Sequence, residues 1–468
     1  MISQQSRNLL IEYYHRLAAV SCHALFGEAP NSDSTQFSPE FRLPPLDGSL
    51  RDFLTPATAA WTPLGRYRGH ELHLLDLMRN PATQTTKTYA SLLMVARAVE
   101  HIRRTGQRIA IFTPTSGNKG IALRDAVERA IIAKIVTPDE LSIVTLAPWS
   151  ARTKFRSTQL STNIALRHRN PALFYSGSRR EEVKALLREF VRQEGKTFKD
   201  LYGMNIWFSL DIRNYMMADA ARAFLEHEVH PTVSGSPRRI HAHAVSSGFG
   251  LLGYNLGNEI LASEGLVEVG NRPSFLLVQH LDTPDMVLHA LYGSTDRLRL
   301  PTFHHSETAD LYEQYSDPHF PLITDSPNEV IDPTFYTRQP STTAAMSRLI
   351  AQFGGTGIVV SRHECLMRHQ EIRRLLTPAG LLLRESLDAV REWSLIMAMT
   401  GVLNSIDRGL IEDRVEVVIH GSGYYCDGDY DSIEESACIV VNDMEDLVQA
   451  LLSPRGDTVC SSVCSSSS

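Results

Sequence analysis

The sequence of 468 residues contains 43% apolar and 21% charged residues and carries a formal net charge of -7 at pH 7. This composition indicates a globular protein with a large core, and the lack of a basic block argues against nucleic acid as a partner. No apolar run approaches the roughly 20 residues that cross a bilayer, and the N-terminus lacks a secretory signal pattern. We therefore expect a cytoplasmic protein that binds neither membrane nor nucleic acid.

The cysteines are few and widely spaced. No two of them form a CxxC pair, and none combines with histidines at the spacing of a zinc site. We therefore expect reduced thiols and no structural metal, as in most cytoplasmic proteins. The six positions are Cys22, Cys365, Cys426, Cys438, Cys460 and Cys464.

Residues 1–61 are predicted to form a helical arm and a linker. Residues 4–27 place apolar side chains at helical spacing, and a passage rich in Pro, Ser and Asp follows to about residue 60. Such an arm can lie on the body of its own chain or contact a second copy. The sequence leaves both alternatives open, so a homodimer is possible.

From residue 62 onward, short apolar runs alternate with longer amphipathic runs. Strand followed by helix, repeated along the chain, predicts an α/β fold with parallel sheets. The expected helices cover 88–106, 116–132, 180–195 and 443–452. The expected strands cover 69–78, 108–114, 141–148, 239–247, 274–281, 354–361 and 415–423.

Two stretches break this alternation. Residues 300–340 form a polar, Pro-rich excursion whose length suggests a functional loop or lid. Residues 453–468 are rich in Ser and Cys and have no means of burying a core, so we expect a disordered tail.

Lys87 is the first candidate for chemistry. The chain has only seven lysines among its 46 basic residues, and Lys87 follows the neutral stretch NPATQTT at the start of an expected helix. A lysine in a neutral pocket loses part of its desolvation cost by releasing its proton, and a neutral amine can form a Schiff base with a carbonyl compound. The alternative is an ordinary lysine in a first helical turn.

A second candidate is the GxGxxG pattern that begins at Gly248 and ends at Gly253. Glycines between a strand and a helix let backbone amides approach a phosphate, and Glu268 lies at a suitable spacing to hold the ribose of a dinucleotide. Three alternatives remain: a dinucleotide site, a structural turn, and a phosphate cup for another cofactor.

Two further motifs each follow an expected strand. The stretch from Thr113 to Gly120 brings hydroxyls and amides to a helix N-terminus, which suits a carboxylate. The stretch from Val417 to Gly423 ends a buried strand with His420, Gly421, Ser422 and Gly423. Either motif alone is also typical of a structural turn.

Taken in order, the four motifs resemble those of the fold type II pyridoxal-phosphate enzymes, the tryptophan synthase β-subunit superfamily, and are most similar to threonine synthase-like members. NPATQTTK resembles the family's lysine motif, with Thr85 and Thr86 in place of the usual Ser and Phe. TSGNKG resembles the SSGNxG loop, SSGFG the glycine-rich phosphate cup, and HGSG the C-terminal turn. The resemblance covers about residues 62–440.

The resemblance implies a role for each matching residue. Lys87 would carry pyridoxal 5'-phosphate and act as the catalytic base. The substrate carboxylate would be held by Thr115, Ser116, Gly117 and Asn118. Asn118 would also contact the cofactor ring, and His420 or Ser422 would face the ring nitrogen. The phosphate would be held by Ser246, Ser247, Gly248, Phe249 and Gly250.

The resemblance also implies an architecture. Residues 62–87 and 231–440 would form a large cofactor-binding domain, and residues 88–230 a small mobile domain. Residues 441–468 would add a closing helix and the disordered tail, and residues 1–61 the arm.

The function implied is that of a pyridoxal-phosphate-dependent lyase or β/γ-replacement enzyme acting on an amino acid with a leaving group, with a threonine synthase-like site and a possible role in specialised metabolism. Two alternatives from other classes remain open. One is a non-catalytic homologue with a regulatory or binding role. The other is a nucleotide-binding oxidoreductase that uses the GFGLLG turn.

Overall fold

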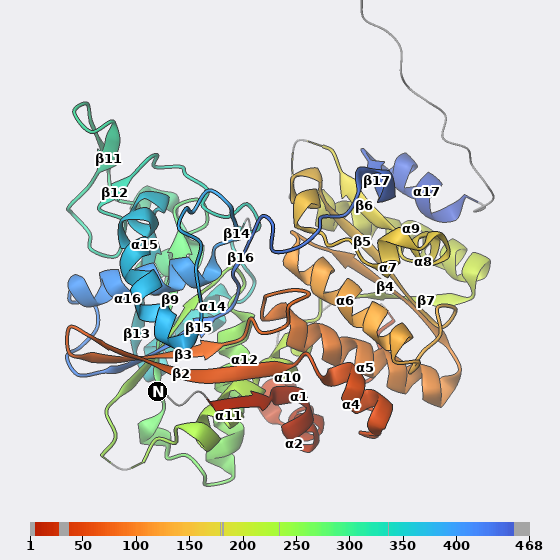
Figure 1. Ribbon diagram of the computed structural model, residues 1–468, viewed down its shortest axis with the longest axis horizontal. Coiled ribbons are helices and arrows are strands. Elements are labelled where there is room, and N and C mark those ends of the chain that lie inside the picture. The colour runs from red at the N-terminus through yellow and green to blue at the C-terminus, as the bar shows by residue number, and fades with distance from the viewer. Residues whose placement is uncertain are drawn as a thin grey trace, which may run out of the picture.

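Two α/β lobes lie side by side in the computed structural model, each built on its own sheet (Figure 1). The structure describes residues 5–27, 37–177, 179, 182–233, 235–335 and 337–453. The predicted α/β class with parallel-rich sheets is confirmed by the strand pairing. The expected disordered tail lies outside the described residues from 454 onward.

The large lobe is organised around a seven-stranded sheet. Its first two pairings are antiparallel and the remaining four are parallel. In spatial order the strands are β1 (Gln5–Asn8), β2 (Thr58–Tyr67), β3 (His70–Asp76), β15 (Glu416–Gly421), β8 (Arg239–Ala244), β9 (Ser274–His280) and β13 (Gly355–Val360).

Helices cover both faces of this sheet, because side chains that alternate along each strand feed two separate cores. Leu276 and Val278 of β9 pack with α15 (Arg362–Leu376) and α16 (Ser394–Asp407). Phe275 and Leu277 point to the opposite face. That face is covered by α10 (Arg213–Asp219), α11 (Ala221–Val229), α12 (Phe249–Ser263), α13 (Asp285–Tyr292) and α14 (Thr343–Phe353).

The small lobe has a fully parallel five-stranded sheet. In spatial order its strands are β17 (Cys438–Val441), β6 (Ala172–Tyr175), β5 (Leu141–Pro148), β4 (Arg108–Pro114) and β7 (Met204–Phe208). Its main helices are α5 (Lys87–Thr105), α6 (Asn118–Ile132), α9 (Glu182–Tyr202) and α17 (Met444–Leu452), with the short α7 (Gln159–Thr162) and α8 (Ile164–Arg169) beside them. Helix α5 also packs against α10, so it joins the two lobes.

The predicted helical arm differs from the structure only at its start, because the chain is extended over the first described residues and helical from Leu9 onward. Residues Gln5–Asn8 form β1, which pairs with β2, and the Asn8 side chain then accepts hydrogen bonds from the N–H groups of Leu10 and Ile11. This cap starts a new helix at Leu9 and keeps the preceding residues extended. The rest of the segment forms α1 (Leu9–Glu12), α2 (Tyr14–Val20), α3 (Ala24–Gly27) and, after the linker, α4 (Gly48–Leu54).

The excursion at 300–340 is partly ordered into a sheet of its own. Three short antiparallel strands, β10 (His304–Ser306), β11 (Leu311–Glu313) and β12 (Ile323–Thr324), extend from the large lobe (Figure 1). A separate antiparallel pair, β14 (Val390–Glu392) and β16 (Tyr425–Cys426), lies where the lobes meet.

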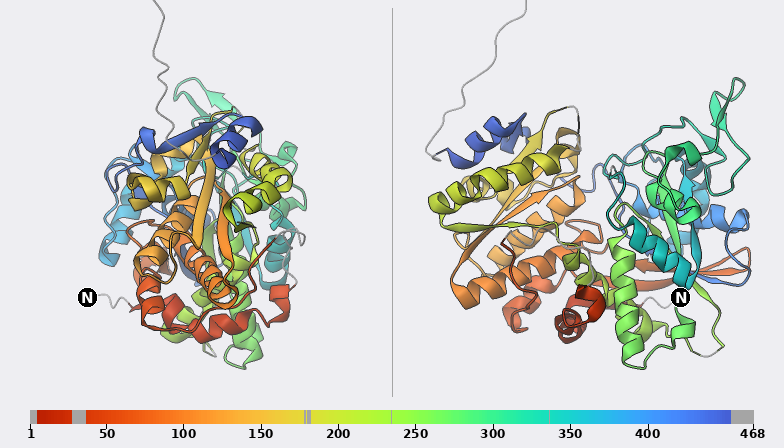
Figure 2. Two further views of the ribbon diagram at one scale, coloured as in Figure 1. Left: turned by 90° about the vertical axis from the view of Figure 1, so that its right-hand side faces the viewer. Right: turned by 180° about the vertical axis from the view of Figure 1, so that it is seen from behind.

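The last described elements of the chain, β17 and α17, lie in the small lobe. Strand β17 pairs with β6. Helix α17, dark blue in Figure 2, packs against the yellow-green α9. Residues from 438 onward therefore complete a sheet whose other strands lie between residues 108 and 208. The predicted boundaries of the large domain (62–87 and 231–440) and of the small domain (88–230) stay a prediction.

Two further expectations concern the whole chain. The four described cysteines, Cys22, Cys365, Cys426 and Cys438, carry free thiols, and the other two lie outside the described residues. Among the described helices, none combines the length and the apolar character needed to span a membrane.

The docking of α17 yields a first prediction. Leu447 is fully buried against the small-lobe core, so Leu447→Ala should lower the free energy of unfolding by about 2–4 kcal/mol. The exposed Val440, just before this helix, serves as the control, and Val440→Ala should change stability by less than about 0.5 kcal/mol. Urea unfolding of both variants checks this; equal stability would show that α17 is not part of the folded lobe.

Candidate active site

Lys87 is the first residue of α5, and the turn before it is fixed by the end of β15. The Thr86 N–H donates to the Ser422 carbonyl at 2.9 Å, and Thr85 pairs with Gly423 in an isolated bridge. The Lys87 side chain is half-buried, and its amine makes no hydrogen bond or ion pair with any described residue. It lies 5.4 Å from the centre of the Tyr215 ring.

The surroundings of Lys87 favour its neutral amine. Burial lowers the pKa of Lys87, and the nearby Arg222 charge lowers it further. The carboxylates of Asp219 and Glu392 act in the opposite direction. The net shift is downward, as the neutral sequence around Lys87 predicts.

Arg222, from the first turn of α11, connects this lysine turn to the rest of the large lobe. Its guanidinium is fully buried and donates to Thr86 Oγ1 at 2.7 Å, to Asp219 Oδ1 at 2.6 Å and to His420 Nδ1 at 3.1 Å. Its Nε has no hydrogen-bond partner among the described residues. Arg222 was not among the residues predicted from the sequence; its only signal is a charged residue in the apolar run AARAFL.

The glycine-rich stretch forms a cup at the N-terminus of α12. Gly248 adopts a left-handed conformation with φ of +68°, and the helix begins at Phe249, so most of GFGLLG is helical rather than a turn. Within the described chain, the backbone N–H groups of residues 247–250 have no hydrogen-bond partner. Unpaired N–H groups at a helix N-terminus suit an anion.

Side chains complete this cup. A Cβ atom added at Gly250 would lie 2.6 Å from Arg222 Nη1 and 3.0 Å from His243 Nε2. Burial and the Arg222 charge lower the pKa of His243 to about 3, so its ring is neutral, and its Nε2 has no partner in the described part of the chain. The cup therefore combines backbone donors, a guanidinium and an unpaired imidazole.

The predicted carboxylate loop lies at the N-terminus of α6, and only some of its polar groups are free to bind a ligand. The Thr115 hydroxyl accepts from the N–H groups of Gly117 and Gly120 at 3.0 and 2.9 Å, so it is engaged within the loop. The Ser116 hydroxyl is half-buried and has no described partner. The N–H groups of residues 116, 118 and 119 are also without a described partner.

Asn118 reaches across to the other lobe. Its amide nitrogen donates to Glu392 of β14, and its oxygen accepts from the Tyr425 hydroxyl of β16 at 2.7 Å. Burial and the Asp332 carboxylate raise the pKa of Glu392. The structure thus adds Glu392 and Tyr425 to the site, two residues that sequence reasoning missed because they are far from Asn118 in the chain.

Another unforeseen contact involves the excursion at 300–340. Lys154 and Asp332 form a buried ion pair of 3.1 Å, and the Lys154 side chain lies beside Gly117. Thr334 of the same excursion is also next to Gly117. The excursion therefore covers the carboxylate loop.

His420 and Ser422 lie at the end of β15 in different settings. Both ring nitrogens of His420 are engaged, Nδ1 with Arg222 and Nε2 with His241 Nδ1 at 2.8 Å. Burial and the neighbouring His241 lower the pKa of His420, so the ring is neutral. The Ser422 side chain is buried and its hydroxyl has no described hydrogen-bond partner.

A second lysine, Lys119 in the first turn of α6, lies near Lys87. Burial lowers its pKa to about 7, and the charges of Lys184 and Lys87 contribute in the same direction. The electrostatic effect of Lys87 places the two amines in the same neighbourhood. Both are therefore candidates for a neutral amine.

The ribose-binding role considered for Glu268 is wrong. Glu268 is exposed and lies beyond the C-terminal end of α12, ahead of β9, where it accepts a hydrogen bond from Asn271. A helix of 15 residues is about 22 Å long. Glu268 therefore cannot reach a ribose bound at the other end of that helix.

Comparison with solved structures gives distant similarities. A threonine synthase from yeast is 10% identical with a TM-score of 0.48, covering 86% of this chain and 73% of that one. A PLP-bound threonine synthase from Brucella melitensis is 13% identical with a TM-score of 0.44, covering 81% and 73%. An L-serine ammonia-lyase from the fungus Rhizomucor miehei is 13% identical with a TM-score of 0.46, covering 76% and 90%.

These TM-scores are below 0.5, so the similarities are too distant to assign an activity. Comparison with curated proteins finds no match. The profile of the Family of unknown function (DUF6002) matches residues 5–454, nearly the whole sequence, and the chain therefore belongs to that family.

Proposed function

We propose that this protein is a pyridoxal 5'-phosphate-dependent enzyme that acts on an amino acid. The observation that carries the proposal is the link between Lys87 and the α12 cup. Arg222 donates to Thr86, next to Lys87, and also lines the cup at Gly250. The Lys87 amine and the anion cup thus lie on either side of one buried guanidinium. A cofactor with an aldehyde and a phosphate group needs an amine and an anion site close together.

The residues present fit such a cofactor. The N–H groups of residues 247–250 and the Arg222 guanidinium would hold its phosphate, and the unpaired Nε of Arg222 adds a donor. Lys87 would bind its aldehyde carbon, and Asn118 would lie at its ring oxygen. Bound there, the cofactor supplies an electron-withdrawing ring that makes the α-proton of an amino acid acidic.

Residues of the chain would position the substrate and move its proton. The N–H groups at the start of α6 and the Ser116 hydroxyl would bind the substrate carboxylate. The neutral Lys87 amine would accept the α-proton, because its lowered pKa keeps it unprotonated closer to neutral pH. The excursion, held by the Lys154 and Asp332 ion pair, would exclude water from this space.

The partner of the ring nitrogen bears on the reaction type. Ser422 offers a free, neutral hydroxyl, whereas both nitrogens of His420 are already engaged. We therefore assign this role to Ser422. A neutral partner leaves the ring nitrogen unprotonated, which favours elimination or replacement of a β or γ substituent, the lyase or threonine synthase-like chemistry expected from the motifs.

A non-catalytic binding role is the second candidate. The observation that favours it is the state of Asn118, whose amide is bonded at both ends to Glu392 and Tyr425. In that role the lobes would stay closed around a bound ligand. An enzyme would convert the amino acid to product, whereas a binding protein would release it unchanged, so a turnover assay separates the two candidates.

The lysine assignment is tested with two variants. A Schiff base between Lys87 and the cofactor should give an absorption band that borohydride reduction removes, and Lys87→Ala should lack this band. The same variant should slow exchange of amino-acid α-protons with deuterated solvent by about 100-fold or more. Lys119→Ala should keep the band. Peptide mapping of the reduced protein should find the pyridoxyl group on Lys87; an adduct on Lys119 alone would overturn the assignment.

The cup is tested by adding a negative charge where the phosphate would bind. Gly250→Asp would place a carboxylate against Arg222 and His243, so the protein should fold but lose bound cofactor. Gly270→Asp, at an exposed position with open space around it, is the matched control and should retain it. Full cofactor occupancy in Gly250→Asp would move the phosphate elsewhere.

The electrostatic environment of Lys119 is tested by competitive acetylation across pH. Only the neutral amine reacts, so Lys119 should gain reactivity as the pH rises through about 7. Lys184→Met removes a neighbouring positive charge and should therefore raise the pKa of Lys119. If the Lys119 titration did not move, the Lys184 ammonium would not lie within electrostatic reach of Lys119.

A further inference from the structure

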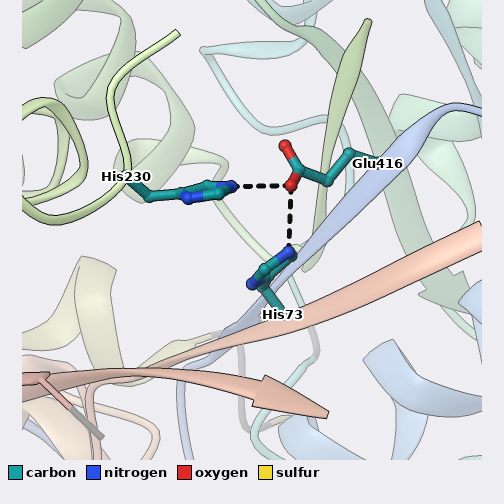
Figure 3. A group of neighbouring side chains, drawn as sticks. All are labelled: His73, His230 and Glu416. Carbon is teal, nitrogen blue, oxygen red and sulfur yellow. Dashed lines mark hydrogen bonds and ion pairs between the residues drawn. The ribbon is translucent and has the colours of Figure 1, made fainter. Parts of the chain in front are cut away.

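A cluster of two histidines and a glutamate lies apart from the candidate active site. His73 belongs to β3, Glu416 begins the neighbouring strand β15, and His230 directly follows α11 (Figure 3). The candidate active site lies at the other end of β15, where His420 and Ser422 are found. The proposed cofactor therefore has no part in this cluster.

The three side chains converge on one point. His73 Nε2 lies 3.0 Å from Glu416 Oε1, and His230 Nε2 lies 2.6 Å from the same oxygen. Figure 3 shows both imidazoles directed at this carboxylate, and the three ligand atoms lie within 4.8 Å of one another. A tetrahedral zinc ion with bonds of about 2 Å needs ligand atoms roughly 3.3 Å apart. The separations of 3.0 and 2.6 Å from Glu416 Oε1 lie near that value.

His73 lacks the hydrogen bonds that a buried imidazole needs. It is 6% exposed, and neither of its ring nitrogens makes a hydrogen bond within the described chain, although Nε2 lies close to the carboxylate. An unsatisfied buried polar group costs about 1–3 kcal/mol, so a missing partner is the simplest explanation. An ion between His73 and Glu416 would give the imidazole the partner that it lacks.

Glu416 is prepared to act as an anionic ligand. Its Oε2 accepts from Arg239 Nε at 2.6 Å, which fixes the carboxylate and leaves Oε1 directed at the two imidazoles. A carboxylate fixed by a second partner is the usual arrangement around protein-bound metal ions.

We propose that His73, His230 and Glu416 bind a divalent transition-metal ion of the zinc class. Two imidazole nitrogens and one carboxylate oxygen form a ligand set that such ions prefer over Mg²⁺ or Ca²⁺. The His230 side chain is 35% exposed, so a fourth position is open to water. The ion would fasten the end of α11 to the sheet, and the first turn of that helix carries Arg222.

This proposal departs from the expectation of no metal, which rested on the local spacing of cysteines and histidines. The ligands come from three separate elements of the chain, so no short motif records them. The fold alone brings them together.

The test uses the full-length protein after treatment with a chelator. Calorimetry should show one Zn²⁺ bound per chain and no binding of Mg²⁺, and Zn²⁺ should raise the Tm. Trp61 lies 5.4 Å from both imidazole rings, so Co²⁺ should quench tryptophan fluorescence until EDTA is added. Failure to bind Zn²⁺ stoichiometrically would overturn the proposal.

Variants locate the ion. His230→Ala and Glu416→Gln should abolish saturable binding, whereas His227→Ala, in the helix just before His230, should bind as the parent does. His230 is the less buried ligand, so its variant remains decisive if Glu416→Gln does not fold. Trp61→Phe should keep the calorimetric signal but lose much of the quenching. Lys87→Ala should bind Zn²⁺ normally; equal binding by His230→Ala would place the ion elsewhere.

Discussion

One buried guanidinium, that of Arg222, fixes the large-lobe side of the candidate site. A buried charge is tolerated only when its partners are in place, and removing one partner typically costs about 3–5 kcal/mol. Asp219 neutralises Arg222, Thr86 ties it to the turn before Lys87, and His420 ties it to the end of β15. Arg222 therefore links the lysine turn, which the end of β15 also holds, to the α12 cup.

The network around Arg222 continues through the sheet in one direction. Because Arg222 can only donate, Nδ1 of His420 accepts, and its Nε2–H is left to donate to His241. His241 then contacts the Tyr254 hydroxyl at 3.0 Å, and Tyr254 donates to Glu226 at 2.5 Å. Both nitrogens of His420 are therefore used within the protein and are not available to a cofactor. The buried polar side chains of β8 and β15 satisfy one another's hydrogen bonds in this chain.

Local patterns predicted the elements that carry the site but not the side chains that complete it. Helix α5 runs from Lys87 to Thr105 and is followed by Gly106 in a left-handed conformation, close to the expected end, and β4, α6 and β5 follow as predicted. Arg222 and Glu392 come from distant segments, and no spacing rule relates them to Lys87. The N-terminal strand was missed for the same reason: its pairing with β2 depends on residues about 50 positions away.

The return of the chain to the small lobe affects how the protein is made. Strands β4, β5, β6 and β7 leave the ribosome long before β17, which begins at Cys438. Until then β6 is an edge strand, and the apolar surface that α17 covers stays open. Such an edge can pair with another chain, and a domain that waits for its last strand is exposed to that competition. Production of the protein should therefore depend on chaperones that shield the unfinished lobe during translation.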